Sequence, residues 1–215
     1  MKNIIFVAPP AAGKGTCSEI LTKKFGYNHI STGDLLREAR IKGDDLGQKI
    51  AKLMDSGALV GDDIVLELLT KELESMDKNQ AFILDGYPRN ILQAKTLDKL
   101  FNDLQINDYL VIYLDIEFDK ALSRTLGRLV CPKCKSGYNK DTASLKPKVD
   151  GICDNCGEAL ITRSDDNEET FKIRFDNYMN ETKPVLDYYK DKEKLVTISA
   201  KQDINIIYEE IERII

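Results

Sequence analysis

The sequence predicts an α/β fold, in which a parallel β-sheet is covered by helices on both faces. Short apolar stretches alternate with amphipathic helical stretches along most of the chain, a pattern typical of parallel sheets. The first apolar stretch, residues 4–7, runs into a turn of small residues and then into a helical stretch. One segment, residues 127–164, breaks the alternation and contains four cysteines. These observations predict a sheet-and-helix body that carries a separate small insertion.

The elements of the body follow from period and length. Buried parallel strands are short and apolar, whereas helices repeat their apolar residues about every 3.6 positions. The predicted strands are residues 4–7, 28–30, 81–84, 109–114 and 195–198. The predicted helices are residues 17–25, 33–41, 62–73, 91–104, 117–126, 165–189 and 204–215. Ligands of such sheets bind beyond the carboxyl ends of the strands, where Pro9, Asp85 and Asp115 are expected to emerge.

Composition limits the classes of function. The chain has 215 residues, of which 42% are hydrophobic and 31% are charged, as in ordinary globular proteins. A formal net charge of −5 argues against a nucleic-acid partner, which usually requires a basic surface. No apolar run approaches the roughly 20 residues that a membrane span needs, and the apolar start is too short for a signal peptide. We therefore expect a cytoplasmic protein without a membrane or nucleic-acid partner.

The turn after the first strand, Ala8 to Thr16, reads APPAAGKGT. A strand, a small-residue turn with Gly-Lys and a helix typically bind nucleotide phosphates through backbone N–H groups, the helix N-terminus and the lysine. The match to GxxxxGK[ST] is incomplete, because Ala8 replaces a glycine and Gly15 replaces the hydroxyl residue. An ordinary strand–helix turn with a surface lysine is the alternative. We favour a phosphate-binding loop with Lys14 as its cation.

Two further motifs follow predicted strands. In STGDLLR, Ser31 to Arg37, Ser31 or Thr32 caps a helix and Arg37 lies about one turn further along; a capped surface helix is the alternative. In DGYPR, Asp85 to Arg89, the carboxylate at the strand end is placed to order the water shell of Mg²⁺. Gly86 permits a close backbone approach, and Arg89 is expected to enter the cleft.

Four arginines lie before and after the cysteine-rich segment: Arg124, Arg128, Arg163 and Arg174. Each one could be plain surface charge. As a set they are typical of phosphate clamps, because a guanidinium offers planar bidentate donors and stays charged. His29, the single histidine, and Cys17 are expected to be packing residues.

The remaining cysteines form C-x2-C-x18-C-x2-C with Cys131, Cys134, Cys153 and Cys156. This spacing predicts one tetrahedral zinc site, and because four thiolates fill it, the metal is expected to be structural. Chance pairs or a disulfide couple are the alternatives. A segment of this length without a core of its own needs such a crosslink.

The motifs together resemble those of the adenylate kinases that have a long, zinc-binding lid. The resemblance is carried by GKGT (Gly13 to Thr16), STGDLLR, DGYPRN, the four cysteines and RSDDNEET (Arg163 to Thr170), and it covers essentially the whole chain. It implies a P-loop NTPase-type core at residues 1–30, 61–126 and 165–215, a helical AMP-binding domain at 31–60 and a lid at 127–164. It also implies a monomer that binds ATP, AMP and ADP and transfers a phosphoryl group from ATP to AMP with Mg²⁺.

The resemblance implies roles for individual residues. The expected ATP-binding residues are Ala11, Ala12, Gly13, Lys14, Gly15, Thr16, Arg124, Arg128, Gly137, Tyr138 and Gln202. The expected AMP-binding residues are Thr32, Arg37, Ala58, Leu59, Val60, Gly86, Tyr87, Pro88, Arg89, Gln93, Arg163 and Arg174. The expected catalytic residues are Lys14, Asp85, Arg89, Arg128, Arg163 and Arg174. Thr32 and Gln93 favour adenine, since relatives that act on UMP or CMP tend to carry alanine and asparagine there.

Some positions depart from the family pattern. Ala8, Ala11 and Ala200 stand where the family has glycine, and Gly137 replaces a hydroxyl residue, so its contact is expected to be through the backbone. If position 11 requires a positive φ, alanine costs about 1–2 kcal/mol there. A kinase of the same fold for another nucleoside monophosphate, and a zinc-ribbon nucleic-acid-binding protein, are the alternative functions.

Overall fold

The structure is a computed structural model that describes residues 1–42, 44–55, 60–77 and 79–215. Its centre is a five-stranded parallel sheet in the order β2-β3-β1-β4-β7, as the alternating pattern predicts. The strands are β1 Asn3–Val7, β2 Asn28–Ser31, β3 Phe82–Asp85, β4 Tyr109–Asp115 and β7 Leu195–Ser199. Asp85 at the end of β3 pairs in register with Phe6 of β1 and Ser31 of β2. The ends of three strands therefore meet at one edge, where the phosphate loop also begins.

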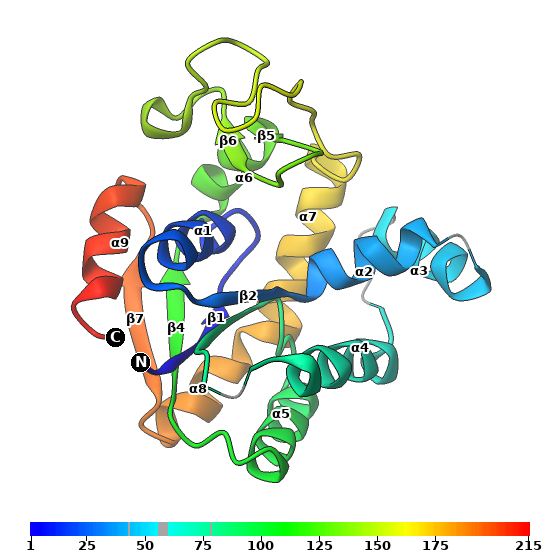
Figure 1. Ribbon diagram of the computed structural model, residues 1–215, viewed down its shortest axis with the longest axis vertical. Coiled ribbons are helices and arrows are strands. Elements are labelled where there is room, and N and C mark those ends of the chain that lie inside the picture. Colours follow the sequence, from blue (N-terminus) through cyan, green and yellow to red (C-terminus); the bar gives the residue numbers. More distant parts are fainter. Residues whose placement is uncertain (43, 56–59, 78) are drawn as a thin grey trace.

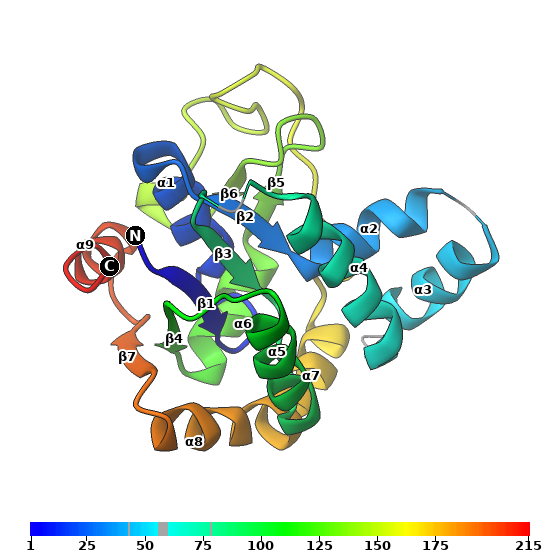
Figure 2. The same cartoon turned by 60° about the horizontal axis from the view of Figure 1, so that its bottom comes forward.

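Helices cover both faces of the sheet (Figures 1 and 2). They are α1 Lys14–Phe25, α2 Thr32–Ile41, α3 Asp45–Asp55, α4 Asp62–Ser75, α5 Ile91–Asp103, α6 Phe118–Leu126, α7 Glu168–Asn177, α8 Pro184–Asp191 and α9 Ile204–Glu212. Adjacent residues of β1 face opposite layers, so that Ile5 packs with the cluster of α4, α5 and α8, and Ile4 with that of α1, α6 and α9. Both clusters are fully buried at their centres, which makes the sheet a rigid platform for its loops.

Side-chain caps fix the helices that begin at the site. The Ser31 hydroxyl accepts a hydrogen bond from the Asp34 N–H at 3.2 Å and starts α2, which confirms one of the two expected caps. Asn90 starts α5 in the same way by accepting from the Gln93 N–H at 2.7 Å. Each cap sets where the following side chains point into the cleft.

The helical region 165–189 is a correction to the sequence prediction. The Asn167 side chain accepts from the Thr170 N–H, so α7 begins at Glu168 and residues 165–166 lie outside it. After α7 comes a π-helical turn, Tyr178–Thr182, and Pro184 opens α8 at a position where its missing N–H costs nothing. One predicted helix is therefore three elements.

Two further features were not predicted. Helix α3 lies between α2 and α4 in the chain. At its start, Asp44 accepts a hydrogen bond from the Gly47 N–H at 2.7 Å. The cysteine-rich segment contains a short antiparallel pair, β5 Arg128–Val130 and β6 Gly137–Asn139, and a 3₁₀ turn, Ala143–Leu145. In Figure 1 this segment lies above the sheet, and α2 and α3 project to one side.

No helix in the described ranges has both the length and the apolar character needed to cross a membrane.

Candidate active site

A cleft of about 800 Å³ opens at the carboxyl edge of the sheet. The phosphate loop, α2, the turn after β3, the segment 127–164 and α7 all contribute to its walls. The sequence-predicted residues that line it are Ala11, Ala12, Gly13, Lys14, Gly15, Thr16, Arg37, Val60, Asp85, Gly86, Pro88, Arg89, Arg124, Arg128, Gly137, Tyr138, Arg163, Arg174 and Gln202. Thr32, Tyr87 and Gln93 line a small adjoining pocket together with Val60, Gly86 and Arg89. Ala58 and Leu59 lie outside the described residues.

The phosphate loop is closed on itself and ends at the N-terminus of α1. Gly13, with φ of 105°, precedes the first helical residue, Lys14. The Lys14 ammonium donates to the carbonyls of Ala8 and Pro9, each at 3.4 Å, and lies 3.9 Å from Asp85 Oδ1. Burial lowers the pKa of Lys14, and nearby arginines add to this effect, while Asp85 opposes it. The lysine is therefore a desolvated cation at the N-terminus of α1, where the helix dipole is positive. Both charges favour binding of a polyphosphate.

Ala11 adopts a φ of 58°. Position 11 therefore has the positive φ at which an alanine is strained. Ala8 and Ala200 are not among the described non-glycine residues with positive φ, so the same strain does not apply to them. The loop therefore carries one strained alanine, and the cost of about 1–2 kcal/mol falls on the phosphate-binding turn itself.

Asp85 lies at the centre of the charged part of the cleft. Burial alone would raise the pKa of its carboxyl group, but the Lys14 charge, the nearby His29 ring and the Arg89 charge outweigh it and lower the pKa. His29 is a correction: we expected a packing residue, but its Nε2 lies 3.8 Å from Asp85 Oδ2 and the ring lines the cleft. The reason is that β2 is a short edge strand whose end reaches the cleft.

Guanidinium groups from three parts of the chain face the same cleft. Arg128 lies 3.5 Å from Asp166, Arg174 donates to Asp165 at 2.8 Å, and Arg89 Nε donates to the Gly86 carbonyl at 2.7 Å. Burial lowers the pKa of Arg89 to about 10 and that of Arg128 to about 10, with like-charged arginines contributing to both. Because all three arginines line one cleft, an anion bound there would face several cations.

Arg124 stabilises the loop from the other side. Its guanidinium donates to the Ala12 carbonyl at 3.5 Å and to the Gln202 carbonyl at 3.2 Å. It therefore connects the phosphate loop to the chain segment that precedes α9.

The adjoining pocket is closely fitted at Gly86 and Thr32. Thr32 donates to the Asp85 carbonyl at 3.3 Å, and a Cβ on Gly86, with φ of 90°, would lie 2.5 Å from the Thr32 hydroxyl. No side chain larger than hydrogen fits there. Gln93, only 3% exposed, accepts from the Arg89 N–H at 2.6 Å and closes the pocket.

The four predicted cysteines come together. Their sulfur atoms lie within 4.8 Å of one another, with Cys131 Sγ and Cys156 Sγ 3.4 Å apart and Cys134 Sγ and Cys153 Sγ 3.5 Å apart. These separations exceed an S–S bond of about 2.05 Å, so the disulfide alternative does not apply. Four thiols in reach of one ion fit tetrahedral zinc.

The cysteine cluster also connects to the cleft. The Tyr138 hydroxyl lies 3.4 Å from Cys153 Sγ and accepts from the Asp154 N–H at 2.8 Å, so the ring is anchored to the cluster while it lines the cleft. The Tyr138 hydrogen bond lowers the pKa of Cys153, which favours its thiolate form.

Comparison with known proteins gives the family. A model of the family described as adenylate kinase matches residues 6–194. Among curated proteins, the adenylate kinase of Petrotoga mobilis is 41% identical over 213 residues, covering 99% of this chain and 97% of the relative. Those of Pseudothermotoga lettingae and Desulforamulus reducens are each 39% identical, covering 99% and 97% of this chain and 97% of each relative. The chain belongs to the adenylate kinase family.

As an adenylate kinase, the chain is a phosphotransferase with the P-loop NTPase fold, and the resemblance stated from its motifs is confirmed. The family binds ATP, AMP and ADP and uses Mg²⁺ with ATP. Of the alternatives, a zinc-ribbon nucleic-acid-binding protein has no support in these comparisons.

Sequence reasoning missed the carboxylates that hold the adenylate kinase site together. Asp34 accepts from Arg37 at 2.6 Å, and Asp165 and Asp166 pair with arginines across the cleft. The spacing of Asp34 three residues before Arg37 on one helix indicates the first pair. Asp62, which contacts Gln93, had no such indication, because the two residues are 31 positions apart.

Proposed function

We propose that this chain transfers the terminal phosphoryl group of ATP to AMP, forming two ADP, in the cleft at the carboxyl edge of the sheet. The observation that carries the proposal is the convergence of Lys14, Arg89, Arg128, Arg163 and Arg174 on that cleft. So many desolvated cations around one cavity are costly unless a polyanion occupies it. Two nucleotides whose phosphates meet supply that charge.

The ATP side is formed by the phosphate loop and the lid. The amides of Ala11 to Thr16 and the Lys14 ammonium bind the β- and γ-phosphates. Arg124 and Arg128, which line the cleft, neutralise negative charge on the ATP phosphates. Gly137, Tyr138 and Gln202 then lie along the rest of the nucleotide.

The AMP side is formed by α2, the turn after β3 and α7. Arg37, Arg89, Arg163 and Arg174 hold the AMP phosphate. Thr32, Val60, Gly86, Tyr87, Pro88 and Gln93 surround the base. Ala58 and Leu59, which lie outside the described residues, remain assigned to this side by the resemblance alone.

The chemistry requires positioning and charge neutralisation. The AMP phosphate oxygen is already anionic and attacks the γ-phosphorus in line, so no general base is needed. Lys14 and the arginines hold the attacking and leaving oxygens on opposite sides of the transferring group. Bound with ATP, Mg²⁺ neutralises charge on the β- and γ-phosphates, and Asp85 is placed to hold its water shell.

Water competes with AMP as the acceptor, so the site must close. We assign residues 127–164 to a lid over ATP and residues 31–60 to an AMP-binding domain, with the rest as the core. Zinc at Cys131, Cys134, Cys153 and Cys156 keeps the lid rigid, and closure of both domains excludes water. We expect the enzyme to act as a monomer in the cytoplasm.

The test is ADP formation from ATP and AMP by the purified protein, with UMP, CMP and GMP as alternative acceptors. Lys14→Met should lower kcat by about 100-fold or more, because it removes charge at the transferring phosphate. Lys71→Met is the matched control, since Lys71 is exposed on α4 and its ion pair within the described part of the chain is with neighbouring Glu67. Folded protein that forms no ADP from ATP and AMP, or equal loss of activity in both variants, would refute the proposal.

A further inference from the structure

The Gln93 side chain is held at both ends of its amide. Its Oε1 accepts from the Arg89 backbone N–H at 2.6 Å, and its Nε2 donates to Asp62 Oδ1 at 2.6 Å. A backbone N–H can only donate and a carboxylate can only accept, so both contacts require the same orientation of the amide. Rotating the amide by 180° would place a donor against a donor at Arg89 and an acceptor against an acceptor at Asp62.

Each oxygen of the Asp62 carboxylate accepts one side-chain amide hydrogen bond. Asn90 accepts from the Gln93 backbone N–H at 2.7 Å through Oδ1, which turns its Nδ2 toward Asp62 Oδ2 at 3.2 Å. One carboxylate therefore receives two amide donors from the first turn of α5. Because Asn90 is fixed by its capping bond, it cannot exchange its donor for an acceptor without losing the cap.

Asp62 contacts the Gln93 amide from outside the pocket. Of these two residues Gln93 lines the small pocket with Thr32 and Val60, whereas Asp62 is not among the described residues that form its wall. The locked amide retains one lone pair on Oε1 and one N–H on Nε2 for a ligand.

We propose that Asp62 is a positioning residue that sets the base specificity of the acceptor site, by holding the Gln93 amide in the orientation that pairs with 6-aminopurines and rejects 6-oxopurines. This inference rests on the proposed function. Adenine presents an amino donor at position 6 and an acceptor at N1, whereas hypoxanthine presents the reverse. A free glutamine amide could rotate to fit either base, but an amide locked at both ends pairs with one and leaves buried groups unpaired against the other.

The experiment compares AMP with IMP, which differ only at position 6 and N1, as acceptors for ATP. The wild-type enzyme should prefer AMP strongly in kcat/KM. Asp62→Asn is nearly isosteric with the wild type. If the oxygen of the new asparagine accepts from Asn90, its NH2 group faces Gln93. A donor in that place favours the rotated orientation of the Gln93 amide, with Oε1 toward position 62. We expect this variant to lower the AMP-to-IMP ratio of kcat/KM by about tenfold or more, since the buried hydrogen bonds then match the other base.

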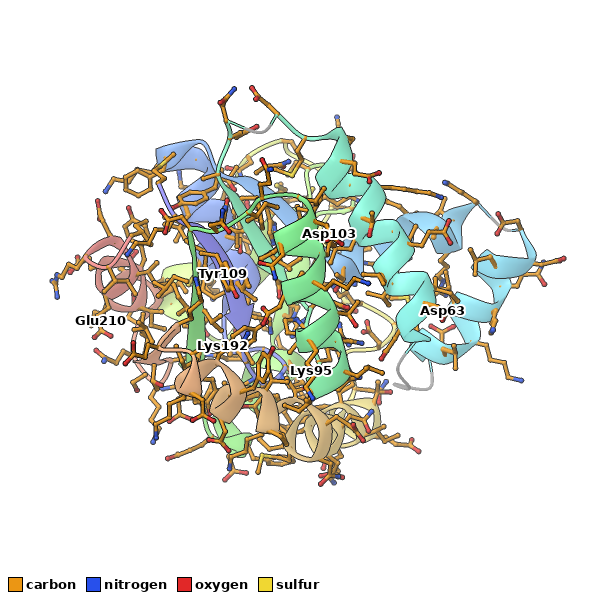
Figure 3. All side chains as sticks on the ribbon, turned by 90° about the horizontal axis from the view of Figure 1, so that it is seen from below. Asp63, Lys95, Asp103, Tyr109, Lys192 and Glu210 are labelled. Carbon is orange, nitrogen blue, oxygen red and sulfur yellow. The ribbon has the colours of Figure 1, made fainter. Side chains whose placement is uncertain are left out.

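Two further variants make the result specific. Asp63→Asn is the matched control, because Asp63 is exposed, lies in the same first turn of α4 and is labelled in Figure 3. Its ratio should equal that of the wild type. Asp62→Ala, which removes one of the two locks without offering a donor, should lower the ratio less than Asp62→Asn and serves if that variant does not fold.

The outcomes separate this inference from the proposed function. If the wild type forms no ADP from ATP and AMP, the proposed function fails. If the wild type forms ADP but does not prefer AMP over IMP, or if folded Asp62 variants keep the wild-type ratio, only the inference is overturned. An equal fall in Asp62→Asn and Asp63→Asn would assign the effect to the charge of α4 and would also overturn it.

Discussion

Ala11 has a strained backbone conformation in the turn that is proposed to bind phosphate. Its φ of 58° lies in the left-handed region, which an L-residue with a Cβ adopts at a cost. The turn keeps this conformation because the amides on either side of it must face one point at the N-terminus of α1. The strain is thus located where phosphate binding requires it, and it can be measured.

Ala11→Gly should stabilise the protein by about 1 kcal/mol, because relief of the strained φ exceeds the added entropy of the unfolded chain. Ala12→Gly is the control: Ala12 is fully buried and is not among the described residues with positive φ, so the change should destabilise by about 1 kcal/mol. Denaturant unfolding of both variants checks the signs. A loss of stability in Ala11→Gly would show that the left-handed turn is not strained in solution.

At the residue scale, the sequence predicts the cations and misses their partners. Lys14 and the arginines could be found because short motifs and local spacing carry them. Asp62 could not, because it contacts Gln93, 31 positions away, and single acidic residues occur on every surface. Asp166 stands in the motif RSDDNEET, but its pairing with Arg128, 38 positions earlier, depends on the fold and not on a local pattern.

At the element scale, the lid has little to hold it together besides the cysteines. Its two strands have three residues each, and its buried residues include Cys131 and Cys153 as well as the polar Ser136 and Asn139. So small a module cannot bury enough apolar surface to remain folded unaided. The metal ligands are therefore the main constraint on its structure.

Removal of the metal by a chelator should lower the midpoint of thermal unfolding by about 5–10 °C, because the folding free energy of the lid comes mainly from metal binding. At low temperature kcat should fall much less, since none of the proposed catalytic residues is a metal ligand. Calorimetry and ADP formation on the same sample, before and after zinc is restored, check this. Equal and fully zinc-reversible losses of both quantities would contradict a purely structural metal.

The predicted elements match the structure where the hydrophobic period alone determines the element. They differ where tertiary contacts determine how a helix is divided. The five strands of the parallel sheet were all predicted; β1, β3 and β4 are short apolar stretches, whereas β2 reads NHIS and buries only Ile30. The helix predicted over residues 165–189 is interrupted at a π-turn in which Thr182 donates to the Arg89 carbonyl at 2.8 Å. That turn depends on a residue 93 positions away, so helical period alone could not reveal it.

At the scale of the whole molecule, an acidic chain builds a cationic interior at one edge of its sheet. The opposite end of the sheet is stabilised by hydrogen bonds and an ion pair to one carboxylate. Tyr109 and Tyr188 donate to Asp98, which also pairs with Lys192. Tyr109 and Lys192 are labelled in Figure 3, away from the lid. The rigid side holds the strands in register, while residues 127–164 and helices α2 and α3 project from it, and we expect these two parts to move when substrates bind.

A hydrogen bond joins the lid to helix α1. The Ser136 hydroxyl donates to Glu19 Oε1 at 3.2 Å, and it accepts from Asn155, which lies between Cys153 and Cys156, at 2.7 Å. The cysteine-rich part of the lid is thus linked to the helix that begins at the phosphate loop. We expect this contact to favour a closed lid, because a contact made in one state and lost in another raises the population of the first.

Ser136→Ala should therefore raise the KM for ATP by about three- to tenfold, because it removes the hydrogen bond to Glu19, of about 1 kcal/mol, together with the bond from Asn155 within the lid, and so reduces the fraction of closed lid. The KM for AMP and the midpoint of thermal unfolding should change little, since the contact lies on the ATP side and outside the core. Ser164→Ala, an exposed serine at the other end of the lid, is the control and should match the wild type. Steady-state kinetics with each substrate varied in turn decide the point: an unchanged KM for ATP would show that lid closure does not depend on this contact.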